Sequence, residues 1–353
     1  MRGTFISVLS LLVVTFACTK GPLYLPDPED VPSGSPIVTV IYDPGALGDM
    51  TYNDLIYEGV ERAAVRYGLR TRQLSPRSQE EGMAYLSSIL GELSSARDTI
   101  RHLLIVPGLS YEGYLRANNR RLEGNPRADL LLFESKDPFE GKGSTLHISL
   151  YGAMYEAGAV TPAFSDEVLV VAANPTDTGV ADALAGFQAG FATNYVLPKD
   201  QKRLFLTYLS DEPGAGFTVD EATALDLMYS QPWSSSGTIV PICGGANAVF
   251  RRLSEFTTGY FQVMGIDRVI PSTSCPYAAV KHSDEAVEHC IGQWLSAEGL
   301  PKHQTLGLSE GYTEMVFCPA DAGEMDQIDK LLPAQVREAI HKEALEKEAQ
   351  YGK

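Results

Sequence analysis

The sequence contains no run of about 18 apolar residues, the length that a membrane-spanning helix needs. It also lacks a GxSxG elbow, a Walker GxxxxGK[ST] loop and an HExxH pair, so it gives no motif support for an enzyme. Basic residues are scarce and scattered, since 28 Lys and Arg stand against 45 Asp and Glu, a formal net charge of −17. Binding to a nucleic-acid polymer depends on clustered Lys and Arg, so we do not expect such a partner.

The composition is that of a globular chain with a sizeable core, because 44% of the 353 residues are apolar and 21% are charged. The length suggests two domains of roughly 150 residues each. Cysteine is rare, and no CxxC or Cys/His metal spacing occurs, so we expect no metal and no cofactor. Besides Cys18, the cysteines are Cys243, Cys275, Cys290 and Cys318. An even number permits disulfides in an exported chain, but buried free thiols are an equal alternative, and no pairing is assigned.

The N-terminus has the pattern of an export signal. Arg2 precedes an apolar stretch from residue 5 to 16, which is too short to span a bilayer, and Ala17-Cys18 follows. This ending resembles the lipobox of bacterial lipoproteins, which implies a signal peptide at 1–17 and lipidation of Cys18. Residues 18–35 then form an anchor and an extended, proline-rich tether. We expect an exported, membrane-anchored monomer in the cell envelope; the alternative is a plain secretory signal.

Buried-strand patterns alternate with helical patterns from residue 36 onward. Expected strands lie at 36–42, 102–106, 129–133, 145–150, 168–172, 204–209, 238–242, 263–266 and 278–281. This alternation predicts an α/β fold with parallel sheets, arranged as two facing lobes. We place 36–150 and about 270–300 in the first lobe, about 151–269 and 301–320 in the second, and a C-terminal helix at 321–353.

Ligands of open α/β sheets bind beyond the carboxyl ends of the strands. The segments that follow the expected strands are therefore the candidates for a binding site. They are 43–53, 107–110, 173–178, 210–216, 243–247, Asp267 and Lys281.

Several of these segments resemble motifs of the basic membrane protein family, the PnrA-like solute-binding lipoproteins of ABC importers. The matching segments, in order, are 43–59, 147–164, 183–191, 243–246, 265–267, 279–287 and 306–315. The resemblance covers about residues 36–320 and implies a two-lobe, type I periplasmic-binding-protein fold. It also implies a purine nucleoside as the solute and an ABC permease as the membrane partner.

This sequence departs from the family pattern at four places near the expected site. Met50 replaces a family lysine and Tyr52 a family phenylalanine. Val240 or Pro241 stands where the family has an aromatic residue, and Arg268 begins an apolar segment where the family has a polar one. These changes bear on the ligand more than on the fold.

The resemblance suggests roles for residues in both lobes. Tyr52 would stack on a nucleobase, or else pack into its own lobe. Asp43 and Asp267 would accept hydrogen bonds from sugar hydroxyls, or else cap the turns in which they lie. Asn53 is either a ligand contact or a helix cap, and Lys281 is either a ligand contact or a surface lysine.

The remaining site candidates are Asp49, Gly108, Gly244 and Gly245. The two adjacent glycines would let backbone amides approach a solute, or else form an ordinary tight turn.

Other functions fit the sequence less well. Gly214 and Gly216 lie in a glycine-containing loop without the third glycine of a dinucleotide site, and His282 and His289 could share a helix face. A sugar-responsive repressor has the same architecture but needs an N-terminal helix-turn-helix, which is missing here. We therefore expect a non-enzymatic, lipid-anchored binding protein for a nucleoside-like solute. The alternative is a lipoprotein that uses the fold for sensing, for adhesion or for another small solute.

Overall fold

The computed structural model describes residues 32–95, 99–212, 214–233, 236–257, 261–269, 274–319 and 322–351. The expected signal peptide, Cys18 and the expected tether up to residue 31 lie outside the described residues. Within these ranges, no helix is long and apolar enough to cross a membrane.

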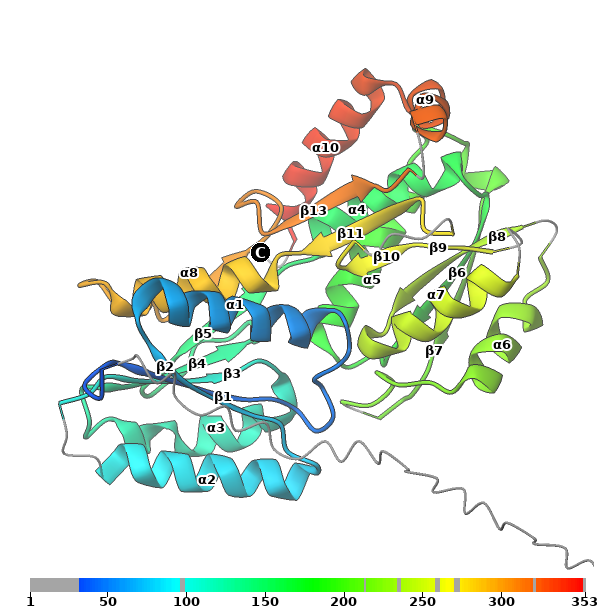
Figure 1. The fold of residues 1–353 in the computed structure, drawn as a ribbon. Helices are drawn as coiled ribbons and strands as arrows, with labels where there is room; N and C mark the ends of the chain where they lie inside the picture. Colours follow the sequence, from blue (N-terminus) through cyan, green and yellow to red (C-terminus); the bar gives the residue numbers. More distant parts are fainter. Residues whose placement is uncertain are drawn as a thin grey trace, which may run out of the picture.

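Strands and helices alternate along most of the chain (Figure 1). The strands are β1 (Ile37–Ile41), β2 (Arg70–Leu74), β3 (His102–Val106), β4 (Ala128–Phe133), β5 (Ser144–Ile148), β6 (Glu167–Ala172), β7 (Arg203–Tyr208), β8 (Gly237–Ile242), β9 (Phe261–Val263), β10 (Gly265–Asp267), β11 (Tyr277–Lys281), β12 (His303–Leu306) and β13 (Thr313–Phe317). The α-helices are α1 (Tyr52–Tyr67), α2 (Gln79–Ser95), α3 (Glu112–Asn118), α4 (Tyr151–Val160), α5 (Thr178–Phe191), α6 (Glu221–Ser230), α7 (Asn247–Phe256), α8 (Ser283–Leu295), α9 (Ala322–Leu331) and α10 (Ala334–Glu348).

The first lobe is built on a six-stranded parallel sheet in the order β12-β5-β4-β3-β1-β2. Helices α1 and α8 cover one face, and α2 and α3 cover the other (Figure 1). β3 is buried at every position because both faces of the sheet are covered, which explains its continuous apolar sequence HLLIV.

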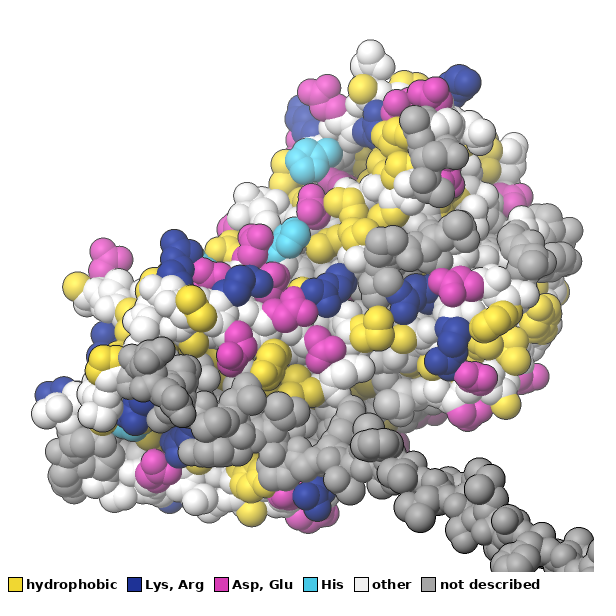
Figure 2. Space-filling view, viewed as in Figure 1, with side chains coloured by type: hydrophobic (Ala, Val, Ile, Leu, Met, Phe, Trp, Pro, Cys, Tyr) yellow, Lys and Arg dark blue, Asp and Glu magenta, His cyan; other side chains and the backbone are white. Residues whose placement is uncertain are grey.

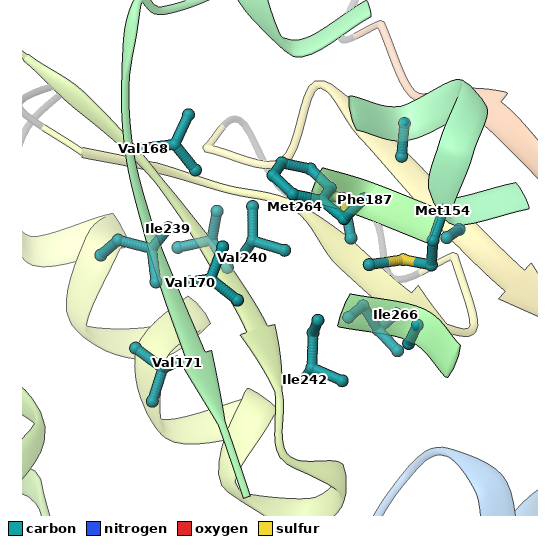
Figure 3. Close-up of a cluster of buried hydrophobic side chains, with 14 of the residues drawn as sticks. Met154, Val168, Val170, Val171, Phe187, Ile239, Val240, Ile242, Met264 and Ile266 are labelled. Carbon is teal, nitrogen blue, oxygen red and sulfur yellow. The ribbon is translucent and has the colours of Figure 1, made fainter. Parts of the chain in front are cut away.

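The second lobe contains two sheets around one core. Four parallel strands run in the order β7-β6-β8-β9, and a smaller sheet has the order β10-β11-β13, in which β13 is antiparallel. Figure 3 shows side chains of β6, β8 and β10 meeting Met154 of α4 and Phe187 of α5 in this core. These layers give the α/β, two-lobe architecture that the sequence predicts.

The lobe boundaries in the last third of the chain differ from our expectation. β11 pairs with β10 and β13, and Tyr277 and Ala279 belong to the core of the second lobe, although we placed this stretch in the first. β12 pairs with β5 of the first lobe, although we placed 301–320 in the second. Chain order cannot reveal these pairings, because they depend on which sheet edge each returning strand reaches.

The C-terminal segment forms two helices instead of the single helix that we expected. Pro333 separates α9 from α10, since proline cannot continue a helix and restricts the residue before it. Leu332 and Ile340 are buried, so this segment packs against the second lobe. Glu348 accepts hydrogen bonds from the backbone nitrogens of Gly152, at 3.1 Å, and Leu308, at 3.0 Å.

Candidate functional site

Two aspartates organise the turn between β1 and α1. Asp49 accepts from the backbone nitrogen of Asn53 at 3.0 Å and from its Nδ2 at 2.9 Å, so Asp49 helps to cap α1 and the Asn53 side chain holds it in place. Asp54 accepts from the backbone nitrogens of Gly48, at 2.7 Å, and Met50, at 2.9 Å. These contacts favour a capping role for Asp49 but not for Asn53, which lies within α1 and donates its side-chain amide to Asp49; a solute contact of either residue stays a prediction.

Asp43 lies two residues after the end of β1, in a nearly closed environment. Its Oδ1 is buried and has no hydrogen-bond partner within the described chain, while Ser110 hydrogen-bonds to the carboxyl group. Burial raises the pKa of Asp43 to about 6; Ser110 opposes this rise, and Asp177 of the second lobe adds to it. Gly108 permits the arrangement, because a Cβ there would lie 2.2 Å from Asp43 Oδ2.

Tyr52 lies at the centre of the site, at the first turn of α1. Its hydroxyl donates to the Pro107 carbonyl at 2.8 Å, and the Lys281 Nζ lies 5.1 Å from the centre of its ring. Lys281 forms an ion pair with Glu134 at 3.1 Å and is only 6% exposed, so it is not a surface lysine. Burial alone would lower the pKa of Lys281, but Glu134 and Asp267 raise it above its ordinary value, which keeps the amine charged.

Glu134 is a site residue that we did not predict. It directly follows β4, which the sequence did predict, so the rule used for the other strands would have identified it. Its Oε1 binds Lys281, whereas its buried Oε2 has no hydrogen-bond partner among the described residues. Oε2 lies 3.7 Å from the Nδ1 of buried His147. Glu134 therefore presents one acceptor atom that the protein leaves unsatisfied.

Asp267 brings a carboxylate from the second lobe to the same site. It ends β10 and is 6% exposed. Burial raises the pKa of Asp267 to about 6; Lys281 opposes the shift, and Asp49 and Glu134, both of the first lobe, add to it. Asp267 thus lies close enough to the first lobe to be affected by its charges.

Backbone strain is concentrated at these strand ends. In the described part of the chain, the non-glycine residues with positive φ are Met50 (58°), Glu134 (63°) and Asp267 (65°). Side chains other than glycine rarely adopt this conformation, and it often occurs at functional sites. All three residues lie on the turns that carry the candidate site.

The Gly244–Gly245 turn brings the second lobe against the first. Gly244 has a φ of 53°, and a Cβ at Gly245 would lie 3.7 Å from the Asp49 Cβ. Val240, which we considered as a substitute for the family's aromatic residue, is fully buried in the core (Figure 3). Phe217 is the aromatic residue beside this turn, 3.1 Å from a Cβ placed on Gly244. Sequence reasoning missed Phe217 because it lies in the loop after β7, and β6 separates β7 from β8 in the sheet.

Direct contacts also join the two lobes. Glu58 of α1 forms an ion pair with Arg268 at 2.7 Å, and Lys136 forms one with buried Asp182 of α5. Figure 2 shows acidic and basic side chains interspersed across one face of both lobes.

A cavity of about 30 Å³ lies between Asp49 and α7. Solute pockets measure roughly 300–1,000 Å³, so a solute the size of a nucleoside could not fit there without separation of the lobes.

His282, directly before α8, and His289, on α8, have separate neighbours. His282 lies 3.1 Å from Glu314, and the ring of His289 lies 5.8 Å from that of Tyr312. Among the residues that the structure describes, no group of three or more His, Cys, Asp or Glu side chains could hold a metal ion.

Comparison with known proteins supports the fold. The chain resembles the transcriptional activator of the comK gene from Bacillus halodurans, with a TM-score of 0.65, 15% identity, and coverage of 87% of this chain and 97% of that one. The fold is that of the type I periplasmic binding proteins.

Two solved structures of binding proteins are also similar to this chain in fold. For an ABC transporter solute-binding protein from Aeropyrum pernix K1, the TM-score is 0.61 and the identity 16%, with 90% of this chain and 86% of that one covered. For GanP, a glucose-galactose binding protein from Geobacillus stearothermophilus, the TM-score is 0.57 and the identity 14%, with 81% and 98% covered. No protein-family model and no curated protein matches the chain.

Proposed function

We propose that this chain is the solute-binding protein of an ABC importer and that it binds a nucleoside-like solute, in the first instance a purine nucleoside, between its lobes. The observation that carries the proposal is the convergence of Asp43, Glu134, Asp267 and Lys281 around Tyr52. These residues come from both lobes and from the strand ends where open α/β sheets bind ligands. No catalytic role is assigned to any of them.

The charges at this site favour a solute that donates hydrogen bonds. Asp43, Glu134, Asp177 and Asp267 supply carboxylates, whereas Lys281 supplies a positive charge that is already paired with Glu134. Carboxylates bind vicinal hydroxyls through charge-assisted hydrogen bonds. An anionic solute would meet an excess of negative charge, so the site favours a neutral or cationic solute.

Aromatic side chains can hold the flat part of such a solute. Tyr52 has Lys281 over its ring, and Phe217 lies beside the glycine turn of the other lobe. Stacking contributes about 1–3 kcal/mol per base, out of about 8 kcal/mol needed for micromolar binding. The rest must come from hydrogen bonds in a site from which lobe closure removes water.

The transport role and the lipid anchor at Cys18 extend this proposal to the membrane. The resemblance to PnrA-like proteins supports an ABC permease as partner, and the similarity to GanP makes sugars the main rival solutes. Sugars and nucleosides share vicinal hydroxyls, so the carboxylates alone do not distinguish them.

A thermal-shift screen of the purified chain against nucleosides, bases, sugars and amino acids tests the proposal. A solute at 100 times its Kd adds about 2.7 kcal/mol to the free energy of unfolding, which should raise Tm by roughly 4 °C for a chain of this length. The hit should lose affinity in Asp267→Asn and Tyr52→Ala, whereas Asp226→Asn, at an exposed position on α6, should bind normally.

The outcomes separate the parts of the proposal. Shifts with sugars alone would refute the nucleoside assignment and keep the binding function. No shift with any class would refute solute binding, and turnover of a hit would indicate an enzyme.

A further inference from the structure

Cys275 and Cys318 lie next to each other at the ends of two paired strands. β11 and β13 are antiparallel, with Tyr277 opposite Phe317. Beyond this pair, the backbone nitrogen of Cys318 donates to the carbonyl of Pro276 at 2.8 Å. Cys275 is therefore one residue away from the direct cross-strand partner of Cys318. The Cys275 thiol donates to the Tyr277 carbonyl at 3.6 Å and the Cys318 thiol to the Val316 carbonyl at 3.9 Å, and each thiol affects the ionisation of the other.

The other two cysteines of the described chain have different surroundings. The thiol of Cys243, at the end of β8, donates to Asn247 Oδ1 at 3.3 Å. The sulfur of Cys290, on α8, accepts from Gln304 Nε2 at 3.0 Å. Both are buried, so they provide matched controls for the neighbouring pair.

We propose that Cys275 and Cys318 form a disulfide when the chain meets a disulfide oxidant, either oxidised glutathione or a disulfide-exchange protein. The Cys318 thiolate attacks one sulfur of the oxidant, which forms a mixed disulfide and releases one thiolate. The Cys275 sulfur then attacks the Cys318 sulfur and releases the second thiolate. The two protein thiols lose two electrons to the oxidant, and their protons pass to the two released thiolates.

The local environment supports this order of attack. The interaction between the two thiols raises the pKa of Cys275 and lowers that of Cys318, and the thiolate is the reactive form of cysteine. Cys318 is partly exposed, whereas Cys275 is buried. Cys318 is thus the residue that an external oxidant can reach, and Cys275 is the residue that completes the bond.

The bond would constrain a long part of the chain. The segment from 275 to 318 leaves the second lobe through β11, passes through α8 and β12 of the first lobe, and returns through β13. Closing a loop of this length restricts the unfolded chain strongly. We expect the oxidised protein to have a Tm roughly 5–10 °C above that of the reduced protein.

Peptide mapping tests the proposal directly, because trypsin places the four cysteines on four different peptides. Cys243, Cys275, Cys290 and Cys318 fall on peptides 204–251, 269–281, 282–302 and 303–330, respectively. The reduced full chain is equilibrated with oxidised glutathione, alkylated in denaturant and digested without reductant. A linked product of 269–281 and 303–330 that disappears on reduction is the expected result.

Variants make the assignment specific. Cys318→Ser should abolish the linked product, whereas Cys290→Ser should leave it unchanged. Recovery of 269–281 and 303–330 as separate alkylated or glutathione-capped peptides would overturn the proposal, as would preferential linkage to either control cysteine. The mapping needs no solute, so its outcome is independent of the proposed transport function.

Discussion

Replacing Lys281 by methionine tests how the charges of the site are balanced. The substitution keeps most of the apolar stem of the side chain but removes the ammonium that lies 3.1 Å from Glu134. Asp267 also depends on this charge, because Lys281 lowers its pKa against the effect of burial. The variant would leave Glu134 and Asp267 in a buried site without their positive partner.

Breaking a buried ion pair by removing one partner destabilises a protein by about 3–5 kcal/mol. The loss should depend on pH. Because Lys281 opposes the rise in the pKa of Asp267, its removal raises that pKa above about 6. Raised carboxyl pKa values reduce stability as pH increases through them, so Lys281→Met should lose more stability at pH 8 than at pH 5.5.

Urea unfolding of wild type, Lys281→Met, Glu134→Gln and the double variant at both pH values measures this effect. The double variant should recover about 2–4 kcal/mol relative to the sum of the single changes, because it removes both members of the ion pair and leaves only Asp267 without its positive neighbour. Arg120→Met, which breaks an exposed pair with Glu140, should change stability by less than about 1 kcal/mol. A loss below 1 kcal/mol for Lys281→Met, or additivity in the double variant, would refute the reasoning.

Other variants test the carboxylates, the lobe contact and the glycine near the site. In urea unfolding, Asp43→Asn should be up to about 3 kcal/mol more stable than wild type at pH 8 and about as stable as wild type near pH 4. The reason is that ionisation of a carboxyl group with a pKa of about 6 opposes folding. Equal stability of the two proteins at pH 8 would contradict this. Arg268→Ala breaks the ion pair with Glu58 between the lobes and should speed solute release up to about fivefold in stopped-flow measurements. Arg252→Ala, which breaks an exposed pair within the second lobe, should leave the release rate unchanged. Equal release rates for the two variants would argue against a role of Arg268 in lobe closure. Gly108→Ala should weaken solute binding at least about tenfold in calorimetry, since its Cβ must displace Asp43, while Gly113→Ala, with no neighbour within 4 Å, should bind like wild type.

The sequence predicts those parts of the fold that depend on local burial. β3 occupies the predicted residues 102–106, and β8 begins one residue before the predicted strand, because continuous apolar runs are typical of strands covered on both faces. β2 escaped prediction, since its sequence RTRQL is polar and it lies at the edge of the sheet. The points at which the chain passes from one lobe to the other were not predicted either, because pairing between strands far apart in the sequence leaves no local pattern.

The candidate site was only partly predictable for the same reason. The strand-end rule identified Asp43, Asp267 and Lys281, but it could not show that they meet at one place or that Lys281 is buried. Glu134 was within reach of that rule and was overlooked. Phe217 was not, because nothing in its own sequence neighbourhood reveals the glycine turn against which it packs.

Under the proposed function, the unsatisfied acceptors of the site link solute binding to lobe closure. Asp43 Oδ1 and Glu134 Oε2 are buried without a partner among the described residues, and such a group costs about 1–3 kcal/mol. In an open arrangement water could satisfy both atoms, so the cost applies mainly when the lobes are together. A solute that donates to these atoms removes the cost in the closed form alone. Its affinity therefore differs between the two forms, and that difference is what a solute needs to drive closure.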